Sequence, residues 1–148
     1  MSASSALFIE LKNELAEVAR LAALVEDYCD EHGLPPKVAF NLNLVLEEVV
    51  VNVIHYAFPD GDAQEPIFVS VALEPAEGKP VRVVCEVRDT GVAFDPLVGG
   101  PPDFELDLES RQVGGLGVHF LRTLMDEVAY ARTERHNCLR FSKALDAA

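Results

Sequence analysis

The chain has little of several features that would assign it to common classes of protein. Its 148 residues include three cysteines, Cys29, Cys85 and Cys138, which are far apart and form no Cys-x-x-Cys pair. An odd number of scattered cysteines argues against a disulfide framework and a zinc site, and it favours reduced thiols in a cytoplasmic protein. No uninterrupted apolar run approaches the roughly 18 residues of a membrane span, and no basic stretch precedes an apolar one at the N-terminus. We therefore expect a protein that is neither exported nor inserted in a membrane.

Positive charge is also scarce. Lysine and arginine contribute 12 residues against 25 aspartates and glutamates, which gives a formal charge of −13. Such an acidic protein is poorly suited to bind nucleic acid or an anionic membrane surface. The 49% of hydrophobic residues indicates a globular protein, and the length is that of one domain with a substantial core.

Hydrophobic periodicity predicts both helices and strands. Helices are expected over residues 14–29, 37–57 and 118–125, and strands over residues 6–11, 67–73, 81–88, 128–133 and 138–143. The second and third strands should pair antiparallel through a hairpin. Helices followed by a meander of strands, with one helix inserted, are typical of an α+β two-layer sandwich.

A stripe of polar residues runs along the otherwise apolar helix expected at 37–57. Asn41, Glu48, Asn52 and His55 fall within about a 60° sector at roughly 100° per residue. Glu48 and Asn52 are one turn apart and can reach the same bound group. The asparagine oxygen is a suitable Mg²⁺ ligand, and the carboxylate a suitable general base. The alternative is that Glu48 pairs with a cation and Asn52 bonds to the backbone. Asn41 and His55 are expected to be supporting or hydrogen-bonded core positions.

The segment Asp89-Thr90-Gly91-Val92-Ala93 directly follows a predicted strand. A carboxylate at a strand end can accept a hydrogen bond from the exocyclic amine of adenine, whereas guanine presents a carbonyl there. Gly91 would let the backbone approach a flat ring closely. Taken alone, Asp-x-Gly is also an ordinary turn.

A second glycine-rich segment, Gly114-Gly115-Leu116-Gly117, precedes the helix expected at 118–125. Free backbone N–H groups and the helix dipole at such a position favour a phosphate. Taken alone, the segment is better explained as a flexible loop or a glycine N-cap.

In combination these three motifs are far more specific. Glu48-x-x-x-Asn52, the Asp89 motif and the Gly114–Gly117 motif, in this order, resemble the N, G1 and G2 boxes of the GHKL (Bergerat-fold) ATP-binding superfamily. The finer resemblance is to the anti-sigma factor serine/threonine protein kinases of bacterial partner-switching systems. Residues 46–58, 89–96 and 113–131 carry it, and it extends from residue 6 to residue 143.

The resemblance implies a fold and a role for each matching residue. The fold is the Bergerat, or histidine-kinase-like ATPase, type, with a mixed, mostly antiparallel sheet covered on one face by three helices. Residues 1–148 would form a single ATP-binding kinase domain with a flexible ATP lid at about 96–113. Glu48 would be the catalytic base and Asn52 the Mg²⁺ ligand. The nucleotide-binding residues would be Asn52, Asp89, Gly91, Ala93, Arg111, Gly114, Gly115, Leu116 and Gly117.

Two departures from the family pattern matter. The lid carries Asp103, Glu105, Asp107 and Glu109 with Arg111 as its only cation. Compensation of the triphosphate charge would therefore fall to Mg²⁺, helix N–H groups and Arg111. His55 lies one position away from the histidine of many relatives, so it receives no catalytic role.

The implied function is an ATP- and Mg²⁺-dependent protein kinase in the cytoplasm. Its substrate would be an antagonist (anti-anti-sigma) protein, a sigma factor would be a second partner, and relatives often form homodimers. One alternative is a nucleotide-sensing switch that binds its partner without phosphorylating it. Another is the catalytic part of a histidine kinase, which needs a helical hairpin with a phosphoacceptor histidine, but only the helix expected at 14–29 precedes the motifs.

Overall fold

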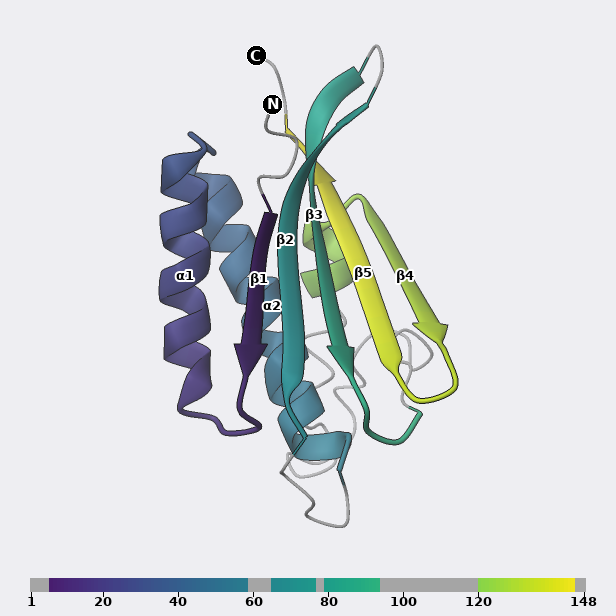
Figure 1. Cartoon of the computed structure of the whole chain (residues 1–148). Helices are drawn as coiled ribbons and strands as arrows, with labels where there is room; N and C mark the ends of the chain where they lie inside the picture. Colours follow the sequence, from purple (N-terminus) through teal and green to yellow (C-terminus); the bar gives the residue numbers. More distant parts are fainter. Residues whose placement is uncertain (1–5, 59–64, 77–78, 94–119, 146–148) are drawn as a thin grey trace, which may run out of the picture.

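The computed structural model describes residues 6–58, 65–76, 79–93 and 120–145. These residues form helices α1 (Glu17–Glu31) and α2 (Pro36–Tyr56) and strands β1 (Ala6–Leu11), β2 (Ile67–Ala76), β3 (Lys79–Asp89), β4 (Glu127–Arg132) and β5 (Asn137–Ala144). Residues 120–124 are also helical. The five strands form one sheet in the order β1-β2-β3-β5-β4 (Figure 1).

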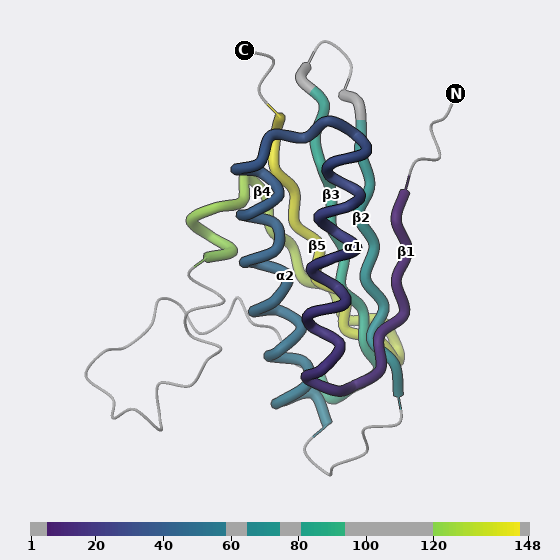
Figure 2. The backbone as a smooth tube through the Cα atoms, turned by 90° about the vertical axis from the view of Figure 1, so that its left-hand side faces the viewer, coloured from purple at the N-terminus to yellow at the C-terminus, as the bar shows by residue number. Residues whose placement is uncertain are grey.

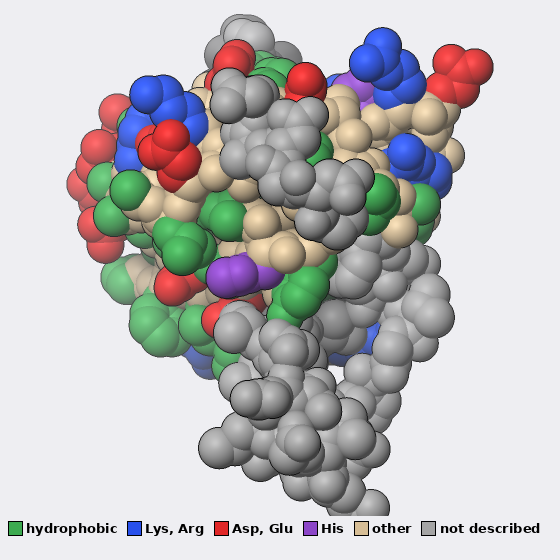
Figure 3. Space-filling model, turned by 90° about the horizontal axis from the view of Figure 1, so that it is seen from below, with side chains coloured by type: hydrophobic (Ala, Val, Ile, Leu, Met, Phe, Trp, Pro, Cys, Tyr) green, Lys and Arg blue, Asp and Glu red, His purple; other side chains and the backbone are tan. Residues whose placement is uncertain are grey.

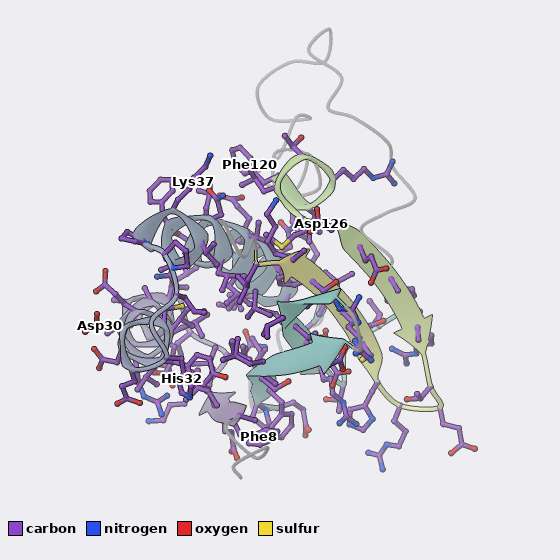
Figure 4. The ribbon with its side chains drawn as sticks, turned by 90° about the horizontal axis from the view of Figure 1, so that it is seen from above. Phe8, Asp30, His32, Lys37, Phe120 and Asp126 are labelled. Carbon is purple, nitrogen blue, oxygen red and sulfur yellow. The ribbon has the colours of Figure 1, made fainter. Side chains whose placement is uncertain are left out.

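Helices and strands form two layers, as expected. α1 and α2 lie side by side over one face of the sheet (Figure 2). Phe8 lies on the other face, where it points away from the helices and is 78% exposed (Figure 4). The α+β two-layer class is confirmed. A mixed sheet was expected, but every strand pairing among the described residues is antiparallel.

α1 is amphipathic and has a well-defined end. Leu21 and Val25 are buried, one turn apart on the face toward the core. The helix ends at Glu31, and Gly33, two residues later, has a φ of 68°, a left-handed conformation that glycine adopts without a Cβ clash. The N–H of Leu34 then donates to the carbonyl of Cys29 at 2.9 Å. This Schellman-type end turns the chain into the start of α2.

α2 is the central helix of the core. Pro36 occupies its first turn, where the missing N–H removes no helical hydrogen bond. The buried residues are Leu42, Val45, Leu46, Val49, Val50, Asn52 and Val53. By length and composition alone α2 is apolar enough to cross a membrane. Its burial against α1 and the sheet accounts for the same composition, because the core helix of a globular domain meets that criterion too.

The strand order brings distant parts of the sequence to one end of the sheet. β3 ends at Asp89, which pairs with Asn137 at the start of β5. Arg132, the last residue of β4, also pairs with Asn137. These strand ends lie beside the C-terminal half of α2, at the lower end of the molecule in Figure 1. The fold therefore brings residues 89 and 137 together next to the polar stripe of α2.

Candidate functional site

A pocket lies between the C-terminal half of α2 and the ends of β3, β4 and β5. Its lining residues are Val49, Asn52, Val53, Val87, Asp89, Tyr130, Asn137 and Leu139. We use two names for this pocket. The helix side consists of the α2 residues Glu48, Val49, Asn52 and Val53. The strand side consists of Val87, Asp89, Tyr130, Asn137 and Leu139. The walls are mainly aliphatic, with polar groups at a few points. Such a lining suits a flat, largely apolar ring with a polar edge.

The helix side contains two buried oxygens that have no hydrogen-bond partner among the residues that the structure describes. Asn52 is only 4% exposed, and its Oδ1 accepts no hydrogen bond within the described part of the chain. Glu48 is half-buried and does not itself line the pocket, but its Oε2 is buried and equally unpartnered. Burial raises the pKa of the Glu48 carboxyl, and the neighbouring Glu47 carboxylate adds to the increase. Unsatisfied buried oxygens cost free energy, so they fit a ligand that offers hydrogen-bond donors or a metal ion.

The polar stripe is shorter than the sequence suggested. His55 is exposed, with its ring 6.0 Å from that of Tyr56, and Asn41 is half-buried. The expectation of a core position for His55 was wrong, because its side chain lies on the exposed face of the last turn of α2, whereas Val53 before it and Ala57 after it are buried in the core. The alternative roles of Glu48 and Asn52 also find no support, since Glu48 Oε2 and Asn52 Oδ1 bond to neither a cation nor the backbone among the described residues. The part of the stripe that the site retains is therefore the single helical turn from Glu48 to Asn52.

The strand side, in contrast, is a continuous hydrogen-bond network. Asp89 is 3% exposed, and its Oδ1 accepts hydrogen bonds from the Gly91 N–H at 2.8 Å and from Asn137 Nδ2 at 3.0 Å. Asn137 Nδ2 also donates to the carbonyl of Val92 at 2.8 Å. The hydroxyl of Tyr130 donates to Asn137 Oδ1. The network fixes the carboxylate of Asp89 at the pocket wall.

Tyr130 and Asn137 were not identified from the sequence. Asp89 and Asn137 are 48 positions apart, and only the adjacency of β3 and β5 brings them into contact. A tyrosine inside the strand predicted at 128–133 and an asparagine in the turn after it give no local signal of a site. The pairing order of the strands was the missing information.

Gly91 is required by packing against α2. A Cβ atom at this position would lie 2.4 Å from the carbonyl oxygen of Ala57. That same oxygen accepts the N–H of Val92 at 2.8 Å, and the carbonyl of Gly91 accepts Arg132 Nη1 at 2.8 Å. The end of α2 and the loop after β3 are thus held in contact. The close approach of Gly91 to a ring remains a separate prediction.

Other predicted residues are less informative. Ala93 is described and exposed. The lid at about 96–113, Arg111, Gly114, Gly115, Leu116 and Gly117 lie outside the described residues. Figure 3 views the molecule from the pocket end, where acidic side chains and one basic group lie at the left, on the α1 side, and basic side chains with an acidic one lie at the right, on the β4–β5 side.

Asn52 is suited to Mg²⁺ in particular. The described residues contain no cluster of three or more His, Cys, Asp or Glu that could hold a metal ion. Mg²⁺ does not need one, because it keeps several waters and binds through one or two protein oxygens together with phosphate oxygens. A single unpartnered carboxamide oxygen is therefore a sufficient donor from the protein.

Comparison with known proteins identifies the family. Residues 11–143 match the model of the histidine kinase-like ATPase domain. The chain belongs to this family. It is 27% identical over 103 residues to the serine/threonine-protein kinase BtrW of Bordetella bronchiseptica. The aligned region covers 70% of this chain and 68% of BtrW. The predicted resemblance to GHKL ATPases is confirmed.

Solved structures agree with this fold. The structure of the RsbU and RsbW domains of Rv1364c from Mycobacterium tuberculosis matches with a TM-score of 0.66 and 15% identity, over 95% of this chain and 32% of that chain. The blue-light activated histidine kinase of Erythrobacter litoralis EL346 matches with a TM-score of 0.50 and 18% identity, over 93% and 42%. This ATPase domain therefore spans less than half of either structure, and at these identities the likeness concerns the fold.

Proposed function

We propose that this ATPase domain is a cytoplasmic, ATP- and Mg²⁺-dependent serine/threonine protein kinase. Its substrate is an antagonist protein of a partner-switching pathway, with a sigma factor as the further partner. One observation carries the proposal: Glu48 Oε2 and Asn52 Oδ1, one turn apart on α2 and across from Asp89, are buried and have no partner among the described residues. The similarity to BtrW, which is named a serine/threonine-protein kinase, supports the reaction type.

Each side chain has a defined task in this proposal. ATP with Mg²⁺ provides the phosphoryl group. Asn52 Oδ1 offers the metal a hard oxygen ligand, and Asp89 accepts a hydrogen bond from the amine of the base. Glu48 takes the proton of the attacking serine or threonine hydroxyl. Its pKa is raised chiefly by burial, which makes it a stronger base than an exposed glutamate.

Few protein groups are needed for this reaction. Phosphoryl transfer passes through a loose transition state, so the protein mainly aligns the hydroxyl, holds the metal and accepts a proton. One base and one metal ligand on a rigid helix meet these requirements. Both Glu48 and Asn52 are on α2, which is fixed in the core by Leu46 and Val50.

The test combines a phosphorylation assay with binding measurements. The protein is incubated with γ-labelled ATP and candidate antagonist proteins, and nucleotide binding is measured by calorimetry. Glu48→Gln should bind ATP like the wild type but transfer phosphate roughly 10²- to 10⁴-fold more slowly, because the general base is lost. Asn52→Ala should lose Mg²⁺-dependent nucleotide binding. The control is Glu47→Gln, whose side chain is exposed beside Glu48.

Three outcomes would overturn the proposal. Nucleotide-dependent complex formation without label transfer would indicate a binding switch. Transfer of label to a histidine of an added acceptor would indicate the catalytic part of a histidine kinase. Normal transfer by Glu48→Gln would remove the assigned base.

A further inference from the structure

We propose that Tyr130 and Asn137 are positioning residues that orient Asp89 to accept a hydrogen bond from the 6-amino group of a purine and to reject a 6-oxo purine. The inference rests on the proposed nucleotide binding and adds the origin of base selectivity. It starts from the hydrogen-bond network of the strand side, which joins the hydroxyl of Tyr130 to the Asn137 amide and that amide to Asp89.

The amide of Asn137 is held in one orientation. Its Nδ2 has two hydrogens, of which one goes to Asp89 Oδ1 at 3.0 Å and the other to the Val92 carbonyl at 2.8 Å. Rotation of the amide by 180° would place Oδ1 against both of these acceptors. The hydroxyl of Tyr130 opposes the rotation further, because it donates to Oδ1 in the observed orientation.

The fixed amide in turn fixes the carboxylate. Asp89 Oδ1 accepts from Asn137 Nδ2 and also from the Gly91 N–H at 2.8 Å. Two donors on one oxygen set the plane of the carboxylate and assign Oδ2 to the ligand. Asp89, Tyr130 and Asn137 all line the pocket, so this orientation is defined at the site where a base would lie.

A carboxylate oxygen held in this way discriminates at one position of a purine. The 6-amino group of adenine donates to it, whereas the 6-oxo group of hypoxanthine or guanine opposes one acceptor with another. Four residues of the surrounding wall, Val49, Val53, Val87 and Leu139, are aliphatic and offer a rejected base no hydrogen-bond donor. Sites built on a buried hydrogen bond reject the analogue that cannot make it by large factors.

The test compares binding of ADP and IDP in the presence of Mg²⁺, because these ligands differ at the 6-position and require no phosphoryl transfer. The wild type should prefer ADP by at least about 100-fold. Tyr130→Phe removes one of the three hydrogen bonds that hold the amide of Asn137 and should reduce the preference about tenfold. Asn137→Asp places an acceptor against Asp89 and Val92 and should abolish the preference.

The matched control is Ser142→Ala. Ser142 is buried on β5, and its hydroxyl donates to Glu127 at 3.3 Å on β4, so the variant removes a hydrogen bond of the same strand pair outside the pocket lining. It should change thermal stability without changing the ratio of the two affinities. If Tyr130→Phe also changed thermal stability without changing the ratio of the two affinities, the role of Tyr130 would be purely structural and the inference would be overturned.

The outcomes separate this inference from the proposed kinase. If ADP is preferred and the variants lose that preference, positioning holds even when no protein is phosphorylated. If the wild type binds ADP and IDP alike, positioning fails even when phosphorylation is observed. If neither nucleotide binds, both proposals fall.

Discussion

The two sides of the pocket differ in whether their buried polar atoms have hydrogen-bond partners. On the strand side, Asp89 Oδ1 receives two donors and the Asn137 amide uses both of its N–H groups. On the helix side, Glu48 Oε2 and Asn52 Oδ1 are buried with no partner in the described part of the chain. A satisfied network is stable without a ligand, whereas unsatisfied buried atoms destabilise the fold until a ligand meets them. The hydrogen bonds of the strand side are therefore formed before a ligand binds, whereas the two oxygens of the helix side would gain their partners from a ligand.

The largest expected effect comes from a substitution that disrupts the contact between the loop after β3 and the end of α2. Gly91→Ala would place a Cβ atom 2.4 Å from the carbonyl oxygen of Ala57, so the loop or the helix end must move. We expect the free energy of unfolding to fall by about 3 kcal/mol, as measured by urea denaturation. Val92→Ala is the control in the same loop, because that side chain is 50% exposed and should matter little. Equal stability of the two variants would show that the contact is not constraining.

The next effect removes the centre of the strand-side network. Asn137→Leu leaves the hydroxyl of Tyr130 without its acceptor and Asp89 Oδ1 with one donor fewer. We expect a loss of about 2 kcal/mol in the free energy of unfolding without ligand. A loss of less than a few tenths would mean that the network contributes nothing to stability.

The same kind of substitution on the helix side should have the opposite sign. Asn52→Leu replaces an unsatisfied carboxamide with an apolar side chain of similar size in an aliphatic setting. We expect the unliganded protein to gain up to about 1 kcal/mol in the free energy of unfolding. Asn41→Leu, at a half-buried position on the same face, is the control. Clear destabilisation by Asn52→Leu would show that Asn52 has a partner in the unliganded protein.

The smallest effect depends on pH. The pKa of Glu48 is raised in the folded state by burial and by Glu47, so the folded protein holds this proton more tightly than the unfolded chain does. The stability contributed by that proton is lost as pH rises from the unfolded value, about 4.3, through the folded one. Glu48→Gln should therefore unfold at a higher temperature than the wild type at pH 8, with the difference vanishing below about pH 4. A difference in unfolding temperature between the two proteins that did not change with pH would contradict a raised pKa of Glu48 in the folded state.

The sequence predicted most of the fold because local patterns determine its elements. The expected helices at 14–29 and 37–57 correspond to α1 and α2, and each expected strand is present with ends shifted by up to three residues. The helix at 118–125 is described only from residue 120. Element ends were the least predictable part, because pairing between strands, which a local pattern does not reveal, sets where β2 and β3 stop.

The two sides of the site differed in predictability for a related reason. Glu48 and Asn52 are four residues apart on one helix, so their proximity follows from helical geometry. Asp89 was found as a strand-end carboxylate, but its partner Asn137 depends on which strand lies next to β3. The predicted lid and the glycine segment Gly114–Gly117 stay predictions.

The adjacency of β3 and β5 has a consequence for how such a domain diversifies. Residues 82–89 and 137–144 form one ladder, and its register places Asp89 opposite its partner Asn137. A shift of this ladder by one residue would turn one of the two side chains to the other face of the sheet, so the β3–β5 register and the Asp89–Asn137 contact can change only together.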